Sequence, residues 1–574
     1  MANCAIVGIN WGDEGKGRMV DYLTERYDVV VRYQGGGNAG HTVINDMGKF
    51  ALHLLPSGIF RKGVMNILGN GVALDCENLV QEMETLRAAG VSISPENLMV
   101  SSRASLLLPW HRELDALEEA RLKDKKYGST KQGIAPFYSD KYQKKTVQAG
   151  ELLYPEHLKA HLQDLLEWKN LILQKVYGAK GYTMEELEQW LDTYAAQVRP
   201  YVADTGRYLR KAQDEGKAIL FEGQLGALRD LDYGIYPYTT SSNTIAAYAP
   251  VGAGLPTAKI DEVVGVVKAY SSCVGEGPFT CEWFGEDAEK LREAGAEYGA
   301  KTGRPRRVGP IDLVATRYGV EVQGATNIAL TKLDILSYMA EIPVCAAYEI
   351  DGRITHEFPF PAVLEQAKPV MEYRPGWQCD ISGARTWEEL PQAARDYVAY
   401  VEKAIGCHIG YVSVGAERES LIVRYYAALS IDMRRGRRPR RPAVLSENCL
   451  NSNGASRTPP PTNGFDARSY CANSIPIMPP GAAYRSFSLF SLHSSLLRRP
   501  SYVPLHLPVP AGVTVRLAVH AAPVLGRQPL SDLAAAVDGA GPRPARPGPA
   551  HHGAAGGGAG GPHRRHRLRR GRPA

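Results

Sequence analysis

Short apolar runs alternate with amphipathic stretches along the first 426 of the 574 residues. Runs rich in β-branched residues predict strands over residues 4–9, 28–32, 66–68, 218–221, 262–268, 327–331 and 342–348. Amphipathic spacing predicts helices over residues 79–89, 109–123 and 184–194. This alternation is typical of α/β proteins, so we expect a large, mostly parallel sheet flanked by helices. Because such sheets bind ligands beyond the carboxyl ends of their strands, the glycine-rich loops there are the first place to look for chemistry.

The alternation stops after Tyr426. Residues 427–574 contain 21 arginines, no lysine and five acidic residues, a net charge of +16, which leaves −10 for residues 1–426. They also hold 20 of the 38 prolines. We therefore predict a catalytic domain over 1–426 and a disordered Arg/Pro/Ala/Gly-rich tail over 427–574. The composition favours a frameshift or read-through product, and a genuine basic extension or a fused folded unit are the alternatives.

Cysteine use and hydropathy bear on the compartment. The nine cysteines show no CxxC spacing and an odd count, which favours free, reduced thiols. The N-terminus begins almost at once with an apolar, strand-like run rather than a basic leader, and no apolar stretch reaches the roughly 18 residues of a membrane helix. The sequence thus predicts a cytoplasmic protein without a membrane partner.

The first predicted strand runs into the loop GINWGDEGKG, residues 8–17. Its glycines allow backbone N–H groups to approach phosphate oxygens, and a following helix N-terminus favours an anion. The loop is not a standard Walker A motif, because Asn10 and Gly17 stand where that motif has Gly and Ser or Thr. Asp13 is then the nearest candidate metal ligand, beside Lys16. A glycine-rich turn with a solvated Asp-Glu pair is the alternative.

A second glycine-rich loop, RYQGGGNAGHT, follows the strand predicted over 28–32 and presents Asn38 and His41. We expect loops at neighbouring strand ends to bring the Asp13 carboxylate and the His41 imidazole to one reacting centre, as coupled proton removal and donation require. A structural histidine is the alternative. The small residues Ala39 and Gly40 before His41 favour the site.

Two further loops carry candidate ligand-binding side chains. In NIALTKLDIL, Asp334 can accept two guanine N–H donors while the stem of Lys332 covers the base; a strand-to-helix turn with an N-cap is the alternative. In YGAKTGRPRRVGPID, the arginine cluster suits a dicarboxylate or a phosphate, and a solvated basic loop is the alternative.

The motifs WGDEGKG, GGGNAGHT, GSTKQGIAP, YPYTTSSN, KTGRPRR, TKLD and VSVGAER occur in the order found in adenylosuccinate synthetases. Residues from about 1 to 425 thus resemble that family. The resemblance implies a GTP-dependent ligase, which joins IMP and L-aspartate into adenylosuccinate with release of GDP and phosphate, through a 6-phosphoryl-IMP intermediate, in AMP biosynthesis. It also implies GTP as co-substrate, one Mg²⁺ per subunit and a homodimer.

The resemblance assigns roles to individual residues. Asp13 is implied as the base, His41 as the acid and Gln224 as a third catalytic residue, with Mg²⁺ on Asp13 and the Gly40 carbonyl. The GTP-binding residues implied are Gly12, Asp13, Glu14, Gly15, Lys16, Gly17, Gly40, His41, Thr42, Lys332, Asp334, Ser413 and Gly415. The IMP-binding residues implied are Asp13, Asn38, Ser129, Thr130, Lys144, Gln224, Thr240 and Arg304, with Lys144 reaching the partner subunit's site. The aspartate-binding residues implied are Thr302, Arg304 and Arg306.

Several positions depart from the family pattern. The chain reads EGQLG where the family commonly reads EGAQG, so Gln224 stands one place early and either the loop adjusts its register or the contact is lost. Lys144 replaces the usual arginine and offers a point charge in place of a fork. Lys301, Pro305 and Ala416 also differ from the usual residues. These departures affect substrate affinity more than reaction type.

Two rival functions fit parts of the sequence. A GTPase-like or nucleotide-kinase switch accounts for the glycine loop and KLD, but it leaves the arginine and His41 loops without a role. A nucleic-acid-binding role for the tail would rest on its +16 charge. Because the tail lacks regularly interleaved aromatic residues, such binding is expected to be weak and non-specific, so no specific nucleic-acid partner is predicted.

Overall fold

The computed structural model describes residues 3–45, 47–299 and 303–424. The tail predicted over 427–574, and the domain boundary before it, therefore lie outside the described residues. Among the helices in the described part of the chain, none is long and apolar enough to cross a membrane.

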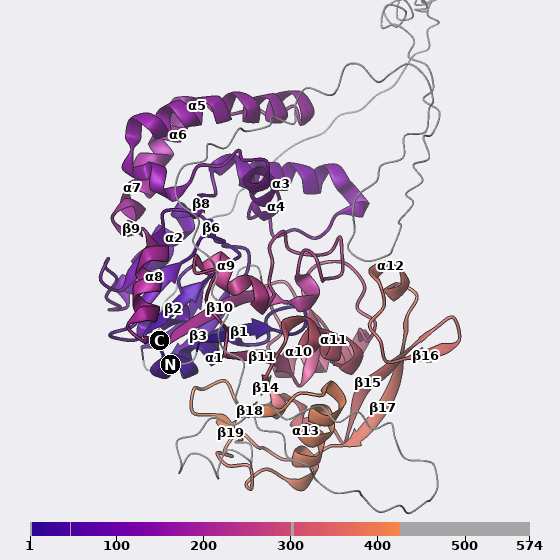
Figure 1. Cartoon of the computed structure of the whole chain (residues 1–574). Coiled ribbons are helices and arrows are strands. Elements are labelled where there is room, and N and C mark those ends of the chain that lie inside the picture. The colour runs from indigo at the N-terminus through magenta and orange to yellow at the C-terminus, as the bar shows by residue number, and fades with distance from the viewer. Residues whose placement is uncertain (1–2, 46, 300–302, 425–574) are drawn as a thin grey trace, which may run out of the picture. The chain divides into compact units, whose positions relative to one another are not determined.

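A ten-stranded sheet forms the centre of the fold (Figure 1). Every neighbouring pair is parallel except β18 and β19. The strands in order across the sheet are β19 (Leu421–Val423), β18 (Ile409–Ser413), β14 (Asn327–Thr331), β11 (Glu262–Lys268), β1 (Cys4–Gly8), β10 (Ile219–Gly226), β2 (Val29–Arg32), β5 (Met65–Leu68), β7 (Leu98–Ser101) and β9 (Val202–Ala203). The predicted large, mostly parallel sheet is confirmed.

Alternate side chains of β1 enter opposite hydrophobic layers, which is why the strand reads as a continuous apolar run. Cys4 and Ile6 pack with residues of α1, whereas Ala5 and Val7 pack with residues of α8 and α9. Helices thus cover both faces of the sheet. The α-helices are α1 (Lys16–Leu23), α2 (Cys76–Ala88), α3 (Pro109–Leu122), α4 (Ile134–Tyr142), α5 (Pro155–Leu171), α6 (Met184–Trp190), α7 (Ala196–Val198), α8 (Thr205–Asp214), α9 (Ala249–Ala253), α10 (Gly285–Gly295), α11 (Leu313–Gln323), α12 (Pro361–Leu364) and α13 (Gln392–Ile405).

One predicted strand belongs to a different sheet. The run over 342–348 forms part of β15 (Glu341–Ile350), which pairs antiparallel with β16 (Arg353–Thr355) and β17 (Lys368–Pro375) and parallel with β13 (Arg307–Asp312). The remaining strand of this sheet is β12 (Tyr270–Cys273). Figure 1 shows β15, β16 and β17 to one side of the central sheet. A strand's apolar run does not specify its partners, so the sequence pattern could not separate the two sheets.

The order of the central strands also corrects one expectation. The two glycine-rich loops do not follow neighbouring strands, because β10 lies between β1 and β2. The loop after β10 thereby enters the space between them. The two loops still meet, through a short hairpin of β3 (His41–Asn45) and β4 (Gly48–Leu52) that packs on α1.

Candidate active site at the strand ends

The loop after β1 is organised by the buried Glu14 carboxylate. Its Oε1 accepts hydrogen bonds from the backbone N–H groups of Asn10 (3.2 Å) and Gly12 (2.8 Å), and its Oε2 accepts one from Lys16 Nζ (2.6 Å). Asp13 stands at the tip of the loop with φ 60° and a side chain 26% exposed. The protein therefore uses Glu14 to shape the loop and leaves the Asp13 carboxylate accessible.

Helix α1 begins directly after this loop, with Gly15 as its N-cap in the left-handed region (φ 99°). No side chain caps the first turn, so its backbone N–H groups are available to an anion. Gly17 lies in that turn, and a Cβ there would stand 2.3 Å from His41 Cδ2. Only glycine at position 17 therefore leaves room for His41 beside the glycine-rich loop that follows β1.

His41 is held by groups that the sequence did not single out. Its Nε2 hydrogen-bonds Ser57 Oγ (2.9 Å) and lies 3.3 Å from Glu222 Oε1. Glu222 in turn accepts bonds from the Ser57 N–H and hydroxyl, at 2.9 and 3.0 Å. Burial lowers the pKa of His41 well below its ordinary value, and the nearby charges of Arg32, His53 and Lys16 act in the same direction. The imidazole is therefore neutral in this arrangement, and because the Ser57 hydroxyl donates to Glu222, the single N–H of His41 is the Nε2–H that Ser57 Oγ accepts.

Gln224 faces the second glycine-rich loop. Its Oε1 accepts from the Gly36 N–H (3.1 Å), and its Nε2 donates to the carbonyls of Gly36 (2.8 Å) and Ala39 (2.9 Å). The next residue, Leu225, adopts φ 60° and lies beside Gly12. The β1–β10 register shifts at this point, so the EGQLG segment is an irregular part of β10. The amide of Gln224 is engaged with the loop that carries Asn38.

A buried carboxylate, Glu297, joins three cationic side chains. Arg306 Nη1 (2.9 Å), Lys268 Nζ (2.8 Å) and Lys332 Nζ (2.7 Å) all contact it, and Arg306 also places Nε 3.0 Å from Asp13 Oδ2. Burial alone would raise the pKa of Glu297, but these three cations outweigh burial and hold that pKa well below its usual range. Residues from the predicted base, aspartate and guanine sites are therefore linked in one network.

Asp334 shows an unsatisfied acceptor. Its Oδ1 is buried and makes no hydrogen bond to any described residue. Burial raises the pKa of Asp334, and the nearby charges of Lys332 and Arg18 only partly offset that rise. Arg18 donates to Ser413 Oγ and to the Ser420 carbonyl (2.9 Å). A buried carboxylate oxygen without a donor is costly, and a ligand with N–H groups would remove that cost. Gly415 lies beside the same segment, against Ser420.

Thr240 shows the same feature: its Oγ1 is buried and has no hydrogen-bond partner among the described residues. The loop before α4 is ordered by Asp115, which accepts from Ser129 Oγ (2.6 Å) and the Gly133 N–H (2.8 Å), while Thr130 is exposed. Gly133 caps α4 with φ 77° and no side-chain bond. Lys144 is exposed just beyond the C-terminus of α4.

The three arginines of the cluster make different contacts. Arg306 enters the buried network, Arg304 is 59% exposed with Glu276 Oε1 at 3.8 Å, and Arg307 contacts Glu282 and the Gly277 carbonyl (2.8 Å) instead. Thr302, Lys301 and the side chain of Thr42 lie outside the described part of the chain.

Four residues of the site were not predicted from the sequence: Glu222, Ser57, Arg18 and Glu297. Of these, only Glu222 had a local signal, because it directly follows the apolar run over 218–221.

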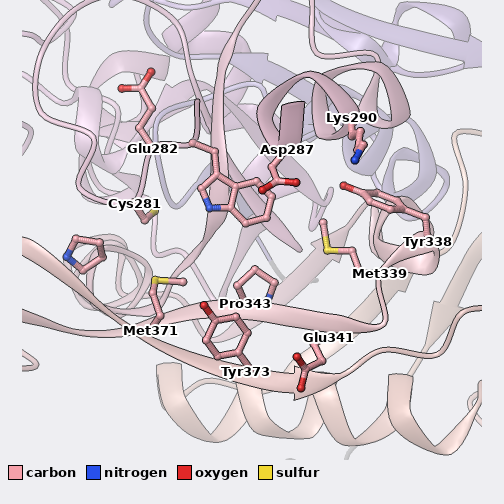
Figure 2. Close-up of a pocket in the computed structure, with 12 residues that line it drawn as sticks. Cys281, Glu282, Asp287, Lys290, Tyr338, Met339, Glu341, Pro343, Met371 and Tyr373 are labelled. Carbon is pink, nitrogen blue, oxygen red and sulfur yellow. The ribbon is translucent and has the colours of Figure 1, made fainter. Parts of the chain in front are cut away.

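A hollow of about 680 Å³ lies elsewhere, between α10, η10 (Leu333–Tyr338), β15 and β17. Figure 2 shows Asp287, Lys290, Tyr338, Met371 and Tyr373 around it. None of the sequence-predicted ligand residues lines this hollow. The candidate site is therefore the group of loops at the strand ends, which is also where a parallel α/β sheet binds its ligands.

Fold and site together define an α/β protein of the nucleotide-binding class, with two glycine-rich loops at the ends of parallel strands. The sequence model of the family described as "Adenylosuccinate synthetase" matches residues 5–422. Curated adenylosuccinate synthetases from Caldanaerobacter subterraneus subsp. tengcongensis and Geobacter sulfurreducens are each 46% identical, over 426 and 424 residues, covering 74% of this chain and 99% and 98% of theirs. The solved structure of fully ligated adenylosuccinate synthetase from Plasmodium falciparum matches with TM-score 0.70 and 34% identity, over 74% of this chain and all of that one.

The chain belongs to the adenylosuccinate synthetase family. It is a GTP-dependent ligase of purine nucleotide biosynthesis, which joins IMP and L-aspartate into adenylosuccinate and uses Mg²⁺. The family match ends where the described residues end, close to the boundary at which the composition changes.

Proposed function

We propose that the loops after β1, β2, β10 and β14 form the active centre of this ligase, with the residue roles implied by the family resemblance. The Asp13–Arg306 contact (3.0 Å) is the observation that carries the proposal. It brings the proposed base together with the proposed aspartate-binding arginine, which lie almost 300 residues apart in the chain. Such convergence is what a two-substrate reaction centre requires.

Asp13 is proposed to remove the N1 proton of IMP, which makes the purine 6-oxygen nucleophilic towards the GTP γ-phosphate. We assign to His41 the stabilisation of the charge that develops on the transferred phosphoryl group. Because Ser57 accepts its Nε2–H in this structure, the ring must release that bond or take up a second proton before it can donate to the phosphoryl group. The 6-phosphoryl group then leaves as phosphate when the aspartate amine attacks, which is easier than the departure of hydroxide. Catalysis is thus mainly positioning and electrostatic stabilisation.

The residues at this point suit Mg²⁺. The proposed ligands are the accessible Asp13 carboxylate and the Gly40 carbonyl, both hard oxygen donors. Gly40 also packs tightly, since a Cβ there would meet His53 Nε2 at 2.9 Å. When bound, the ion would neutralise phosphate charge. We assign the same phosphates to the N–H groups at the start of α1, which no side chain caps, and to Lys16, which in this structure pairs with Glu14.

Substrate recognition is proposed at the two unsatisfied oxygens. Asp334 would accept the guanine N–H donors beside Lys332, Ser413 and Gly415, and Thr240 would contact IMP together with Asn38, Gln224, Ser129, Thr130 and Arg304. Arg306, with Arg304 and Thr302, would bind the aspartate carboxylates. The support is physical, because Asp334 Oδ1 and Thr240 Oγ1 are buried without partners among the described residues.

Phosphate release tests the activity directly. The purified protein should release phosphate only when GTP, IMP and aspartate are all present, and an Asp13→Ala variant should lose turnover. A matched Asp232→Ala variant, at another exposed loop carboxylate, should retain it. Phosphate release that is unaffected by omitting aspartate would contradict the ligase mechanism.

We further propose a cytoplasmic homodimer in which Lys144 reaches the partner's IMP phosphate. Mixed dimers of an Asp13→Ala subunit and a Lys144→Ala subunit separate the alternatives. If Lys144 acts across the interface, the Lys144→Ala subunit keeps an intact Asp13 and receives Lys144 from its partner, so the mixture regains activity. If Lys144 acts within its own subunit, both sites stay defective.

A further inference from the structure

A cluster of two histidines and one carboxylate lies outside the proposed active site, at the start of α5. Glu151 comes from η4 (Ala149–Leu153), and His157 and His161 stand one turn apart in α5. The candidate ligand atoms of all three residues lie within 4.8 Å of one another. Figure 1 shows α5 at one edge of the fold, away from α1 and β1.

The separations fit a small metal ion. Glu151 Oε2 lies 2.7 Å from His161 Nδ1 and 3.5 Å from His157 Nε2. Ligands of a tetrahedral ion with bonds of about 2.0–2.1 Å stand roughly 3.3 Å apart. An ion would therefore need the Glu151–His161 pair to open by about half an ångström, and the His157 and His161 nitrogens, which lie within 4.8 Å of each other, to reach the same spacing by side-chain rotation.

The carboxylate is already positioned. The other oxygen of Glu151, Oε1, accepts the Gln148 N–H at 2.8 Å, which fixes the direction of the ligand oxygen. Among the described residues, the ion-pair partners of Glu151 are only these two histidines. No lysine or arginine of the described chain competes for Oε2, and a hydrogen bond at the far side of a ligand is the usual support of metal sites.

We propose that Glu151, His157 and His161 bind a borderline transition-metal dication, with Zn²⁺ as the reference ion. Two imidazole nitrogens and one carboxylate oxygen favour Zn²⁺, Co²⁺ or Ni²⁺ over the Mg²⁺ of the nucleotide site. The side chain of His157 is 71% exposed and that of His161 30%, so the ion has an open path and free positions for water. The geometry belongs to this surface and does not depend on the proposed catalytic roles.

The ion would cross-link η4 to the start of α5. The η4 turn is already tied to the segment after β7, because the N–H groups of Ala149 and Gly150 donate to the carbonyls of Ala104 (2.7 Å) and Ser102 (2.8 Å). Coordination by η4 and α5 together would fasten the first turns of α5 to that segment. Since an ion that binds only the folded state stabilises it, Zn²⁺ should raise the melting temperature.

Metal titration of the full-length protein in excess Mg²⁺ tests the site. The chain contains 14 histidines and nine cysteines, so variants must be compared. A His157→Ala/His161→Ala double variant should bind one Zn²⁺ equivalent fewer than wild type by calorimetry, and should lose the Co²⁺ absorption assigned to this site. A His356→Ala control, at an exposed histidine whose Nδ1 lies 3.1 Å from the Ala346 carbonyl oxygen, should match wild type.

Two further readouts make the result decisive. Glu151→Gln keeps an acceptor for the Gln148 N–H but removes the anionic ligand, and should weaken Zn²⁺ binding at least tenfold. Zn²⁺ should raise the melting temperature of wild type and of His356→Ala, but not that of the double variant. Ligase activity of the double variant in metal-chelated buffer with Mg²⁺ restored should equal wild type, which shows that it is folded. Equal Zn²⁺ stoichiometry and affinity in wild type and double variant would overturn the proposal.

Discussion

Arg306 contacts Asp13 with one nitrogen and Glu297 with another, at 3.0 Å from Nε to Oδ2 and 2.9 Å from Nη1 to Oε2. A single guanidinium thus connects the tip of the β1 loop to a carboxylate buried beneath the arginine loop. An incoming dicarboxylate must share this guanidinium with Asp13. The contact therefore relates the proposed base to the proposed aspartate site before any substrate is bound.

Replacing Arg306 with Lys should raise the KM for aspartate about tenfold or more, because a planar fork becomes a point charge and a charge-assisted hydrogen bond is worth about 1.5–3 kcal/mol. The KM for GTP should change much less. Steady-state kinetics with each substrate varied in turn measures both. Arg307→Lys is the matched control, since Arg307 bonds Glu282 instead (Nε to Oε1 2.9 Å). Equal changes in the KM for aspartate in the two variants would count against the assignment.

Glu297→Gln should destabilise the protein by about 3–5 kcal/mol at neutral pH, because removing one partner leaves buried cations uncompensated. The folded-state pKa of Glu297 lies below its unfolded value, so this stabilisation is present above the unfolded pKa and is lost as pH falls through the folded one. Urea denaturation at several pH values measures the difference in unfolding free energy between wild type and variant. This difference should become smaller in acid. Glu372→Gln, at the exposed Arg374 pair, should cost less than about 1 kcal/mol.

Gln224→Glu should raise the KM for IMP roughly tenfold. The substitution keeps the shape of the side chain but removes the Nε2 donor that bonds the Gly36 and Ala39 carbonyls, so the loop carrying Asn38 loses its support. Kinetics with IMP varied, together with thermal melting, separates a binding defect from general unfolding. Gln197→Glu, on the exposed surface of α7, provides the control. An unchanged KM for IMP would show that the loop holds its conformation without Gln224.

Asp312→Asn should change how stability depends on pH. Burial raises the pKa of Asp312 to about 6, against hydrogen bonds from the Ala315 N–H and Tyr348 hydroxyl. Its folded pKa is above the unfolded 3.8, so stability is fully present below pH 3.8 and falls as pH rises through 6, by at most about 3 kcal/mol. The Asn variant should lack this decline. Parallel stability curves for wild type and variant over this range would refute the assignment.

Truncation after Tyr426 should leave turnover nearly unchanged, because the family match ends at residue 422. Solubility should improve, since removing the +16 segment changes the net charge from +6 to −10, which is farther from zero. Kinetics and centrifugation of the shortened and full chains check both effects. A large loss of turnover would show that residues 427–574 contribute to the catalytic unit.

Local spacing in the sequence determined much of this protein. The strands over 262–268 and 327–331 were predicted with the bounds that the structure gives them, because each is an apolar run ended by a polar or glycine-rich turn. The loops after β1 and β2 were identified in the same way. The left-handed backbone of Asp13 and the close approach of His41 to Gly17 came from the structure instead.

Tertiary structure alone decided which segments meet. An apolar run does not indicate which strand it pairs with. The position of β10 between β1 and β2, and the place of β15 in a separate sheet, were therefore known only from the strand pairing in the structure. For the same reason Glu222 was not recognised as the neighbour of His41, nor Glu297 as the common partner of Arg306 and Lys332. A carboxylate acquires such a role through burial beside charges that lie far along the chain, and residue spacing carries no record of that proximity.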